Sequence, residues 1–193
     1  MCESRALARL ERETRLSHAE AEADRLSVMT SSIAAATYRS LLVRIHGFEA
    51  PLAEALAGVR DLAAHVDVAA HTRIELLEAD LGALGVSQPH AHARCTDRMA
   101  FASTAVALGW LYVLEHNRVV HPLLERYLAP RLPEPMATAS AYLRSPPRRR
   151  ELGAALEDAA GSDEAAFGQV VYGARFAFRS QRSWYQRAQQ HVA

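Results

Sequence analysis

The amino-acid sequence predicts an all-α protein folded as one multi-helical bundle. Apolar residues recur at intervals of three and four along most of the chain, and strand-like alternation is nowhere sustained. Glycine and proline, the residues that most often interrupt helices, number only 9 and 8 among 193 residues. No repeat and no interdomain linker divides the sequence, so we expect a single domain over residues 1–193 with about seven or eight helices.

The first predicted helix covers about residues 3–25. Its inward face is a stripe with helical spacing, formed by Leu7, Leu10, Thr14, His18 and Ala21. The stripe is apolar except for Thr14 and His18, and Glu22 lies beside it, one turn after His18.

The next predicted elements are also helical. A second helix covers about residues 27–45, and the segment 46–51, which holds a glycine and a proline, interrupts it before a further helical run to residue 65. Residues 66–84 form another helix, which Gly85 ends in the left-handed conformation that glycine favours.

The second half begins with a polar loop over residues 87–95. Asp97 is the expected cap of a long, very apolar helix over about residues 98–115. Residues 116–128 continue this helix with a bend, because Pro122 removes a backbone donor.

A proline-rich segment over residues 129–135 is expected to end that helix. The remaining predicted elements are a short helix over 136–143, a basic turn over 145–150, a helix to residue 160 and a final helix over 162–190.

Composition excludes several classes of function. The 22 basic residues balance the 22 acidic ones, which disfavours nucleic acid and anionic membranes as partners. The two cysteines, Cys2 and Cys95, are too few and too far apart for a disulfide framework or a cysteine-rich zinc module. The first twenty residues are too charged for a signal peptide, and no apolar run reaches the roughly 18 residues that span a bilayer. We therefore expect a soluble, cytoplasmic protein.

The nine histidines are the most informative polar residues, because neutral imidazole is the commonest metal ligand in proteins. His18 lies on the inward stripe, and Glu22 is placed to fix its tautomer and to strengthen it as a ligand. The alternative is a core histidine that bonds its neighbours. His90 and His92 are either solvated loop residues or ligands of a metal ion whose other ligands are not evident from the sequence.

Four segments in a fixed order carry a more specific signal. They are T-x-x-x-H-x-x-A-E over residues 14–22, Tyr38 followed by G-F-E-x-P-L over 47–52, L-E-A-D-L-G-A-L-G over 77–85, and G-W-L-Y-V-L-E over 109–115. In order and spacing, over about residues 7–128, they resemble the heme oxygenase family, in particular its short bacterial branch that is often paired with phytochromes. Residues 178–184 resemble the closing helix of that family.

The resemblance implies that heme lies between the first helix and a bent distal helix. His18 would be the axial ligand of the heme iron and Glu22 its hydrogen-bonding partner, while Thr14 and Ala21 would line the same site. Tyr112 lies inside the fourth motif and is either a heme contact or a core aromatic residue with its hydroxyl bonded.

The family anchors the heme propionates with basic residues. Arg12 and the cluster 148–150, with Arg149 at its centre, are the candidates in this chain, and a solvated arginine-rich turn is the alternative for the cluster.

The implied reaction is oxidative cleavage of heme to biliverdin, iron and carbon monoxide. Heme is then both cofactor and substrate, and an external electron donor is required. A phytochrome-type protein is the biliverdin acceptor that the resemblance suggests.

The chain departs from the family directly after G-W-L-Y-V-L-E. The family continues with G-S-x-L-G-G, whereas residues 116–121 here read H-N-R-V-V-H, so all three glycines are replaced. Asn117 stands in the place of the serine and is carried over as a candidate catalytic residue. Val120 and His121 put side chains where glycines let the backbone approach the porphyrin.

Three outcomes stay open. The distal helix retreats and activity persists; or His121 or His116 supplies a second axial ligand to the heme iron; or the pocket closes and no heme binds. His116 and His121 lie about 140° apart around a helix axis and would not share a face. The function is accordingly a heme oxygenase, a non-catalytic heme- or tetrapyrrole-binding relative, or a structural role on the same fold.

Overall fold

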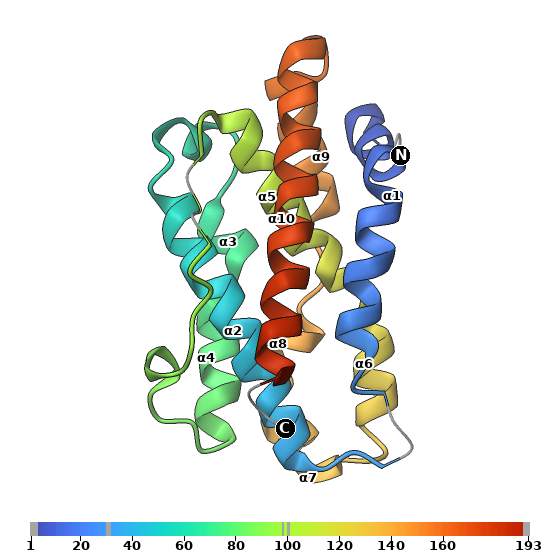
Figure 1. Cartoon of the computed structure of the whole chain (residues 1–193), viewed down its shortest axis with the longest axis vertical. Coiled ribbons are helices and arrows are strands. Elements are labelled where there is room, and N and C mark those ends of the chain that lie inside the picture. Colours follow the sequence, from blue (N-terminus) through green and yellow to red (C-terminus); the bar gives the residue numbers. More distant parts are fainter. Residues whose placement is uncertain (1–3, 30–31, 98, 100, 191–193) are drawn as a thin grey trace.

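The computed structural model describes residues 4–29, 32–97, 99 and 101–190, with side chains to residue 187, and this part of the chain is helical without any strand (Figure 1). The α-helices are α1 (Arg5–Leu26), α2 (Ala35–Ala57), α3 (Val68–Thr72), α4 (Ile74–Ala83), α5 (Thr104–Asn117), α6 (His121–Leu128), α7 (Pro133–Thr138), α8 (Ala141–Arg144), α9 (Arg149–Ala160) and α10 (Glu164–Gln190). Three short 3₁₀ turns join them: η1 (Arg60–Ala64), η2 (Pro89–Ala91) and η3 (Arg118–Val120). The predicted all-α class is confirmed.

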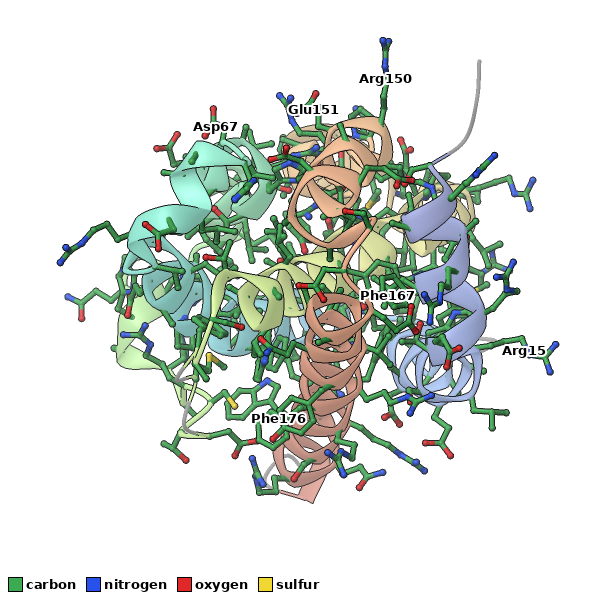
Figure 2. The ribbon with its side chains drawn as sticks, turned by 90° about the horizontal axis from the view of Figure 1, so that it is seen from above. Arg15, Asp67, Arg150, Glu151, Phe167 and Phe176 are labelled. Carbon is green, nitrogen blue, oxygen red and sulfur yellow. The ribbon has the colours of Figure 1, made fainter. Side chains whose placement is uncertain are left out.

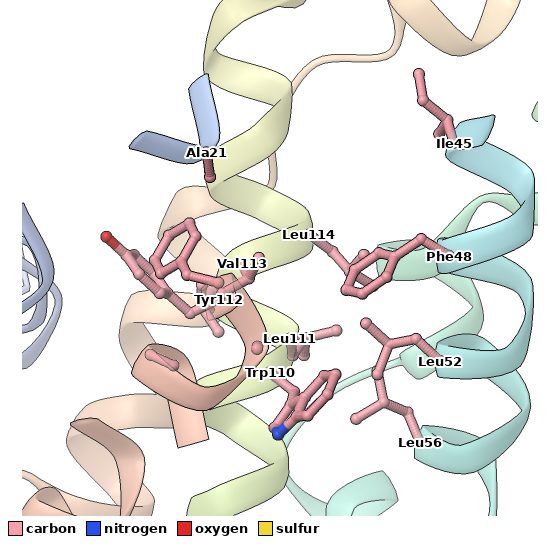
Figure 3. Packing of buried hydrophobic residues seen from close by; sticks show 14 of the residues in the cluster. Ala21, Ile45, Phe48, Leu52, Leu56, Trp110, Leu111, Tyr112, Val113 and Leu114 are labelled. Atoms are coloured by element: carbon pink, nitrogen blue, oxygen red, sulfur yellow. The ribbon is translucent and has the colours of Figure 1, made fainter. Parts of the chain in front are cut away.

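Helix α5 is the centre of the molecule. Every residue from Ala105 to Asn117 is buried, which explains why this helix is apolar on all sides as far as Leu114. Phe48 and Leu52 of α2 point toward α5 from one side (Figure 3), and α10 packs along another. Helix α1 and helices α2–α4 lie on opposite sides of the α5–α10 pair (Figure 1).

Two glycines bring α5 and α10 into backbone contact. A Cβ atom on Gly109 would lie 2.2 Å from the carbonyl oxygen of Val170, and one on Gly173 would lie 2.3 Å from that of Val106. No side chain fits at either position, so the glycine of the G-W-L-Y-V-L-E motif is required by helix packing.

Helix α1 buries the stripe that the sequence predicts. Leu7, Leu10, Thr14 and Ala21 are buried, and His18 is half-buried at the same face. Ser4 caps the helix by accepting the backbone N–H of Leu7 at 3.1 Å. Arg15, on the opposite face, points away from the bundle (Figure 2).

The predicted interruption at residues 46–51 is wrong, because α2 continues through it to Ala57. Pro51 lacks the N–H that would bond the carbonyl of Gly47 four residues earlier. The backbone N–H of Cys95 donates to that carbonyl instead, at 2.7 Å. A donor 48 positions away in the sequence therefore satisfies the carbonyl that the proline leaves free.

The predicted helix over residues 66–84 is two helices. Arg73 has a φ of 55°, in the left-handed region, and breaks the segment between α3 and α4. The predicted end at Gly85 is confirmed, since its φ is 80°.

Helix α5 begins later than predicted. Ser103 caps it by accepting the N–H of Val106 at 3.3 Å, whereas the carboxylate of Asp97 bonds Arg187 at 3.2 Å. The predicted bend inside one helix is wrong, because η3 separates α5 from α6. Pro122 lies in the first turn of α6, where its missing N–H costs no helical hydrogen bond.

The predicted short helix over residues 136–143 is also two helices, α7 and α8. The carboxylate of Asp80 on α4 accepts the backbone N–H groups of Ala141 at 3.0 Å and Tyr142 at 2.9 Å. These are donors that the start of α8 cannot satisfy within the helix. Asp80 lies in the third sequence motif and joins α4 to α8.

Among the described helices, none combines the length and the apolar character that crossing a bilayer requires.

Candidate functional site

Three side chains of the kind that bind metal ions meet where α1 crosses the end of α5. Nε2 of His116 lies 2.8 Å from Nδ1 of His18 and 3.0 Å from Oε1 of Glu22. Nδ1 of His18 and the same carboxylate oxygen are 3.9 Å apart. His18 and Glu22 face the same way because they are four residues apart on α1, and His116 comes from the last turn of α5.

This cluster is buried on the α5 side and reaches solvent on the α1 side. The side chain of His116 is 7% exposed, while those of His18 and Glu22 are 20% and 30% exposed. Burial, and to a smaller extent the nearby His18, lowers the pKa of His116 to about 4. His116 is therefore a neutral imidazole at physiological pH.

The hydrogen-bonding atoms of the cluster are mostly acceptors. A neutral His116 that carries its proton on Nε2 can donate to Glu22 and to His18, and this single proton is then shared by two acceptor atoms. The outer ring nitrogens, Nε2 of His18 and Nδ1 of His116, are buried without a hydrogen-bond partner in the described part of the chain. A cation placed among the three inner atoms would satisfy all of them at once.

Aromatic rings surround the two imidazoles. The rings of His18 and His116 meet edge to face, with centroids 4.5 Å apart, and Phe178 of α10 lies 5.8 Å from His116. Tyr112 donates its hydroxyl to Thr14, 3.2 Å away, because the Thr14 hydroxyl itself donates to the carbonyl of Leu10. Burial raises the pKa of Tyr112 to about 12, so this hydroxyl stays protonated.

These contacts leave no place for a porphyrin between α1 and α5. Thr14 touches Tyr112, and His18 touches His116. Two helical turns after His18, a guanidinium nitrogen of Arg25 lies 3.4 Å from the carbonyl of Asn117 and 3.2 Å from Nε2 of His121. A heme in this gap would have to separate every one of these pairs, so heme does not fit the residues as they are arranged here.

The residues carried over for the distal wall lie in the core. The side-chain amide of Asn117 pairs with that of Gln181, at 2.8 and 3.2 Å, and Val120 is buried. His121 contacts Arg25 and packs on Tyr142, with ring centroids 4.9 Å apart. The histidine that meets His18 is thus His116 rather than His121. As expected from their spacing, the two face different partners.

Ala21 is buried and lies one residue before Glu22 of the cluster. Arg12 is exposed on α1. Arg149, at the start of α9, pairs with Glu11 of α1 at 2.5 Å. The Arg149–Glu11 pair is close enough to His116 to act on its pKa, and its two charges act in opposite directions.

Sequence reasoning missed a buried polar network beside the cluster. Glu49 accepts from Arg25 at 2.9 Å and from the hydroxyl of Tyr142 at 2.6 Å. Glu115 accepts from His71 at 2.7 Å and from Arg118 at 3.4 Å. The available signal was a charged residue inside each of two apolar motifs, but the partners come from other helices.

Comparison of the chain with family models, with curated proteins and with solved structures finds no match. The resemblance to heme oxygenases consequently rests on the four sequence motifs, and the family stays a prediction.

Proposed function

We propose that this protein binds a divalent transition-metal ion through His18, Glu22 and His116, on a bundle of the heme oxygenase type. The observation that carries the proposal is the convergence of two imidazole nitrogens and one carboxylate oxygen from two helices, with separations of 2.8, 3.0 and 3.9 Å.

The donor set supports this choice of ligand. Ligands bonded to zinc at about 2.0–2.1 Å in a tetrahedron lie about 3.3–3.4 Å apart, so side-chain shifts of about half an ångström or less would accommodate an ion. Two imidazoles and one carboxylate suit Zn²⁺ and Fe²⁺ rather than Mg²⁺ or Ca²⁺.

The partial exposure of His18 and Glu22 supports a coordination position open to water or a small substrate. A bound ion would supply Lewis acidity at that position. The protein would contribute a neutral His116, kept so by burial, and aromatic walls from Tyr112 and Phe178.

Heme binding by His18 is the second candidate. It is favoured by one atom, Nε2 of His18, which is buried without a partner while Nδ1 is oriented by His116. It requires α1 to separate from α5, and the oxygenase reaction with an external electron donor belongs to this candidate.

His116→Gly separates the two candidates, because it removes a metal ligand and restores the glycine of the family. We expect wild-type protein to bind Co²⁺ at this site, with the absorption of a low-symmetry complex, and to give no Soret band with hemin. His116→Gly should lose this equivalent of Co²⁺ and give a Soret band if the heme site is latent.

His18→Ala should lose the binding of Co²⁺ at this site and of hemin. His92→Ala is the matched control, because His92 is exposed and lies outside the cluster. Undiminished Co²⁺ binding in both His18→Ala and His116→Gly would overturn the metal proposal. A Soret band in wild-type protein that disappears in His18→Ala, and that decays to biliverdin with ascorbate in air, would establish the second candidate instead.

A further inference from the structure

A second group of metal-ligating side chains lies on the other side of the bundle, between α2, α4 and η2. Oε1 of Glu78 on α4 is 3.2 Å from Nε2 of His46 on α2 and 3.1 Å from Nε2 of His90 in η2. The two imidazole rings meet at 65° with centroids 5.2 Å apart, and the three ligand atoms all lie within 4.8 Å of one another. Two histidines from distant parts of the chain thus aim the same nitrogen at one carboxylate oxygen.

The burial and charges around this group favour the binding of a cation. His46 is almost fully buried, and burial lowers its pKa, so its imidazole is neutral at physiological pH. The positive charge of Arg94 also lowers the pKa of His46, and Arg94 is itself paired with Glu54 at 2.6 Å. The side chain of His90 is 58% exposed, which gives an ion access from solvent.

We propose that His46, Glu78 and His90 form a second, structural binding site for a divalent transition-metal ion of the zinc type. The donors are two imidazole nitrogens and a carboxylate oxygen, with water as the fourth ligand. The distances of 3.1 and 3.2 Å to the shared carboxylate oxygen approach the spacing of zinc ligands. This site is independent of the one at His18, since no residue is common to both.

The position of His90 indicates what the ion does. Residues 85–97 contain no helix longer than the three-residue turn η2, and the backbone N–H of Cys95 anchors this segment to the carbonyl of Gly47 at 2.7 Å. Gly47 follows His46 directly. An ion held by His46 and His90 would therefore fasten the same segment to α2 at a second point.

The reactivity of Cys95 measures how firmly residues 85–97 are held against α2. Its thiol is buried, and burial raises its pKa, so it reacts only when the segment lifts from α2. If lifting releases the ion, an ion at 100 times its Kd lowers the population of the lifted state by about 100-fold.

The experiment measures the reaction of Cys95 with a thiol reagent such as DTNB in a Cys2→Ser variant, where Cys95 is the single thiol. We expect Zn²⁺ to slow the reaction by about 100-fold relative to protein in EDTA. His90→Ala should abolish this protection and remove one equivalent of bound Zn²⁺. His92→Ala, two residues further on and outside the cluster, should keep both.

Three results would overturn the proposal. The first is no protection of Cys95 by Zn²⁺, and the second is protection that persists in His90→Ala. The third is a cobalt–thiolate charge-transfer band when Co²⁺ replaces Zn²⁺ in the Cys2→Ser variant, because Cys95 itself would then be the ligand. His116→Gly tells this proposal apart from the preceding one. It should leave the protection of Cys95 unchanged whether or not a metal ion binds at His18.

Discussion

At the scale of single residues, the dominant feature is the number of charged groups in the core. Arg25 and Glu49 form an ion pair at 2.9 Å with both side chains almost completely buried. Such a pair is weak evidence of net stabilisation, but removing one partner leaves an uncompensated buried charge. Replacing Arg25 or Glu49 alone should therefore lower the free energy of unfolding.

Arg25→Met should destabilise the protein by about 3–5 kcal/mol, because Glu49 keeps only the Tyr142 hydroxyl and a more distant Arg118. Urea denaturation monitored by circular dichroism measures the loss. Arg144→Met is the matched control, since Arg144 pairs with Glu125 at the surface and should cost at most about 1 kcal/mol. Equal losses in the two variants would show that burial of the pair is not what matters.

The sequence predicted which face of a helix a residue lies on, but not which distant residue it contacts. The stripe of α1, with His18 on it, follows from helical periodicity alone and is where the sequence placed it. The partner of His18 was not predictable in this way, because His116 is 98 positions away and its approach depends on how α1 crosses α5. The partners of His90 were not evident from the sequence for the same reason, since Glu78 and His46 come from other elements.

At the scale of elements, helix boundaries depend on contacts between helices. Pro51 is a helix breaker by its chemistry, yet α2 passes through it because the N–H of Cys95 bonds the carbonyl of Gly47. Asp97 and Ser103 are both residue types that cap helices well, and the sequence alone does not distinguish them. Ser103 is the cap because α5 begins at Thr104 in the folded bundle. The class of each long element was predictable, whereas its ends were set by distant partners.

Gly173→Ala tests the close packing of α5 and α10. A Cβ at this position meets the backbone of Val106, so the helices must move apart, at a cost of about 3 kcal/mol. Thermal unfolding should show a clear loss of Tm.

Gly168→Ala is the control for this substitution on the same helix. It is exposed and has no neighbour within 4 Å, so alanine should raise the stability by about 0.5–1 kcal/mol. A loss of similar size at both positions would contradict the close approach.

At the scale of the whole molecule, one hydrophobic cluster extends from Ala6 on α1 to Tyr185 on α10 and includes residues of α2, α4 and α5. With a core shared in this way, unfolding should be a single cooperative transition. Circular dichroism and tryptophan fluorescence should then give superimposable denaturation curves. Two separated transitions would show that part of the bundle unfolds independently.

The pH dependence of stability is a second property of the whole molecule. Burial, with help from Arg25 and Arg118, holds the pKa of His121 well below its usual value near 6.5. Below pH 6.5 the unfolded chain therefore binds a proton at His121 that the folded chain does not, and the free energy of unfolding falls as the pH falls.

His121→Gln isolates this contribution. Below pH 6.5, wild-type protein should lose about 1.4 kcal/mol per pH unit more than the variant does, measured by urea denaturation in EDTA between pH 6 and pH 4. Parallel pH profiles for the two proteins would mean that His121 is protonated in the folded state.

The link between Asp80 and α8 has a consequence for the order of events in folding. A helix of four residues has almost no stability by itself, since nucleation costs more than its few hydrogen bonds return. Helix α8 must therefore form after α4 has brought the Asp80 carboxylate into place, and it must dissolve when α4 does. The amide proton of Tyr142, although it belongs to one of the shortest helices, should exchange with solvent on the timescale on which α4 opens.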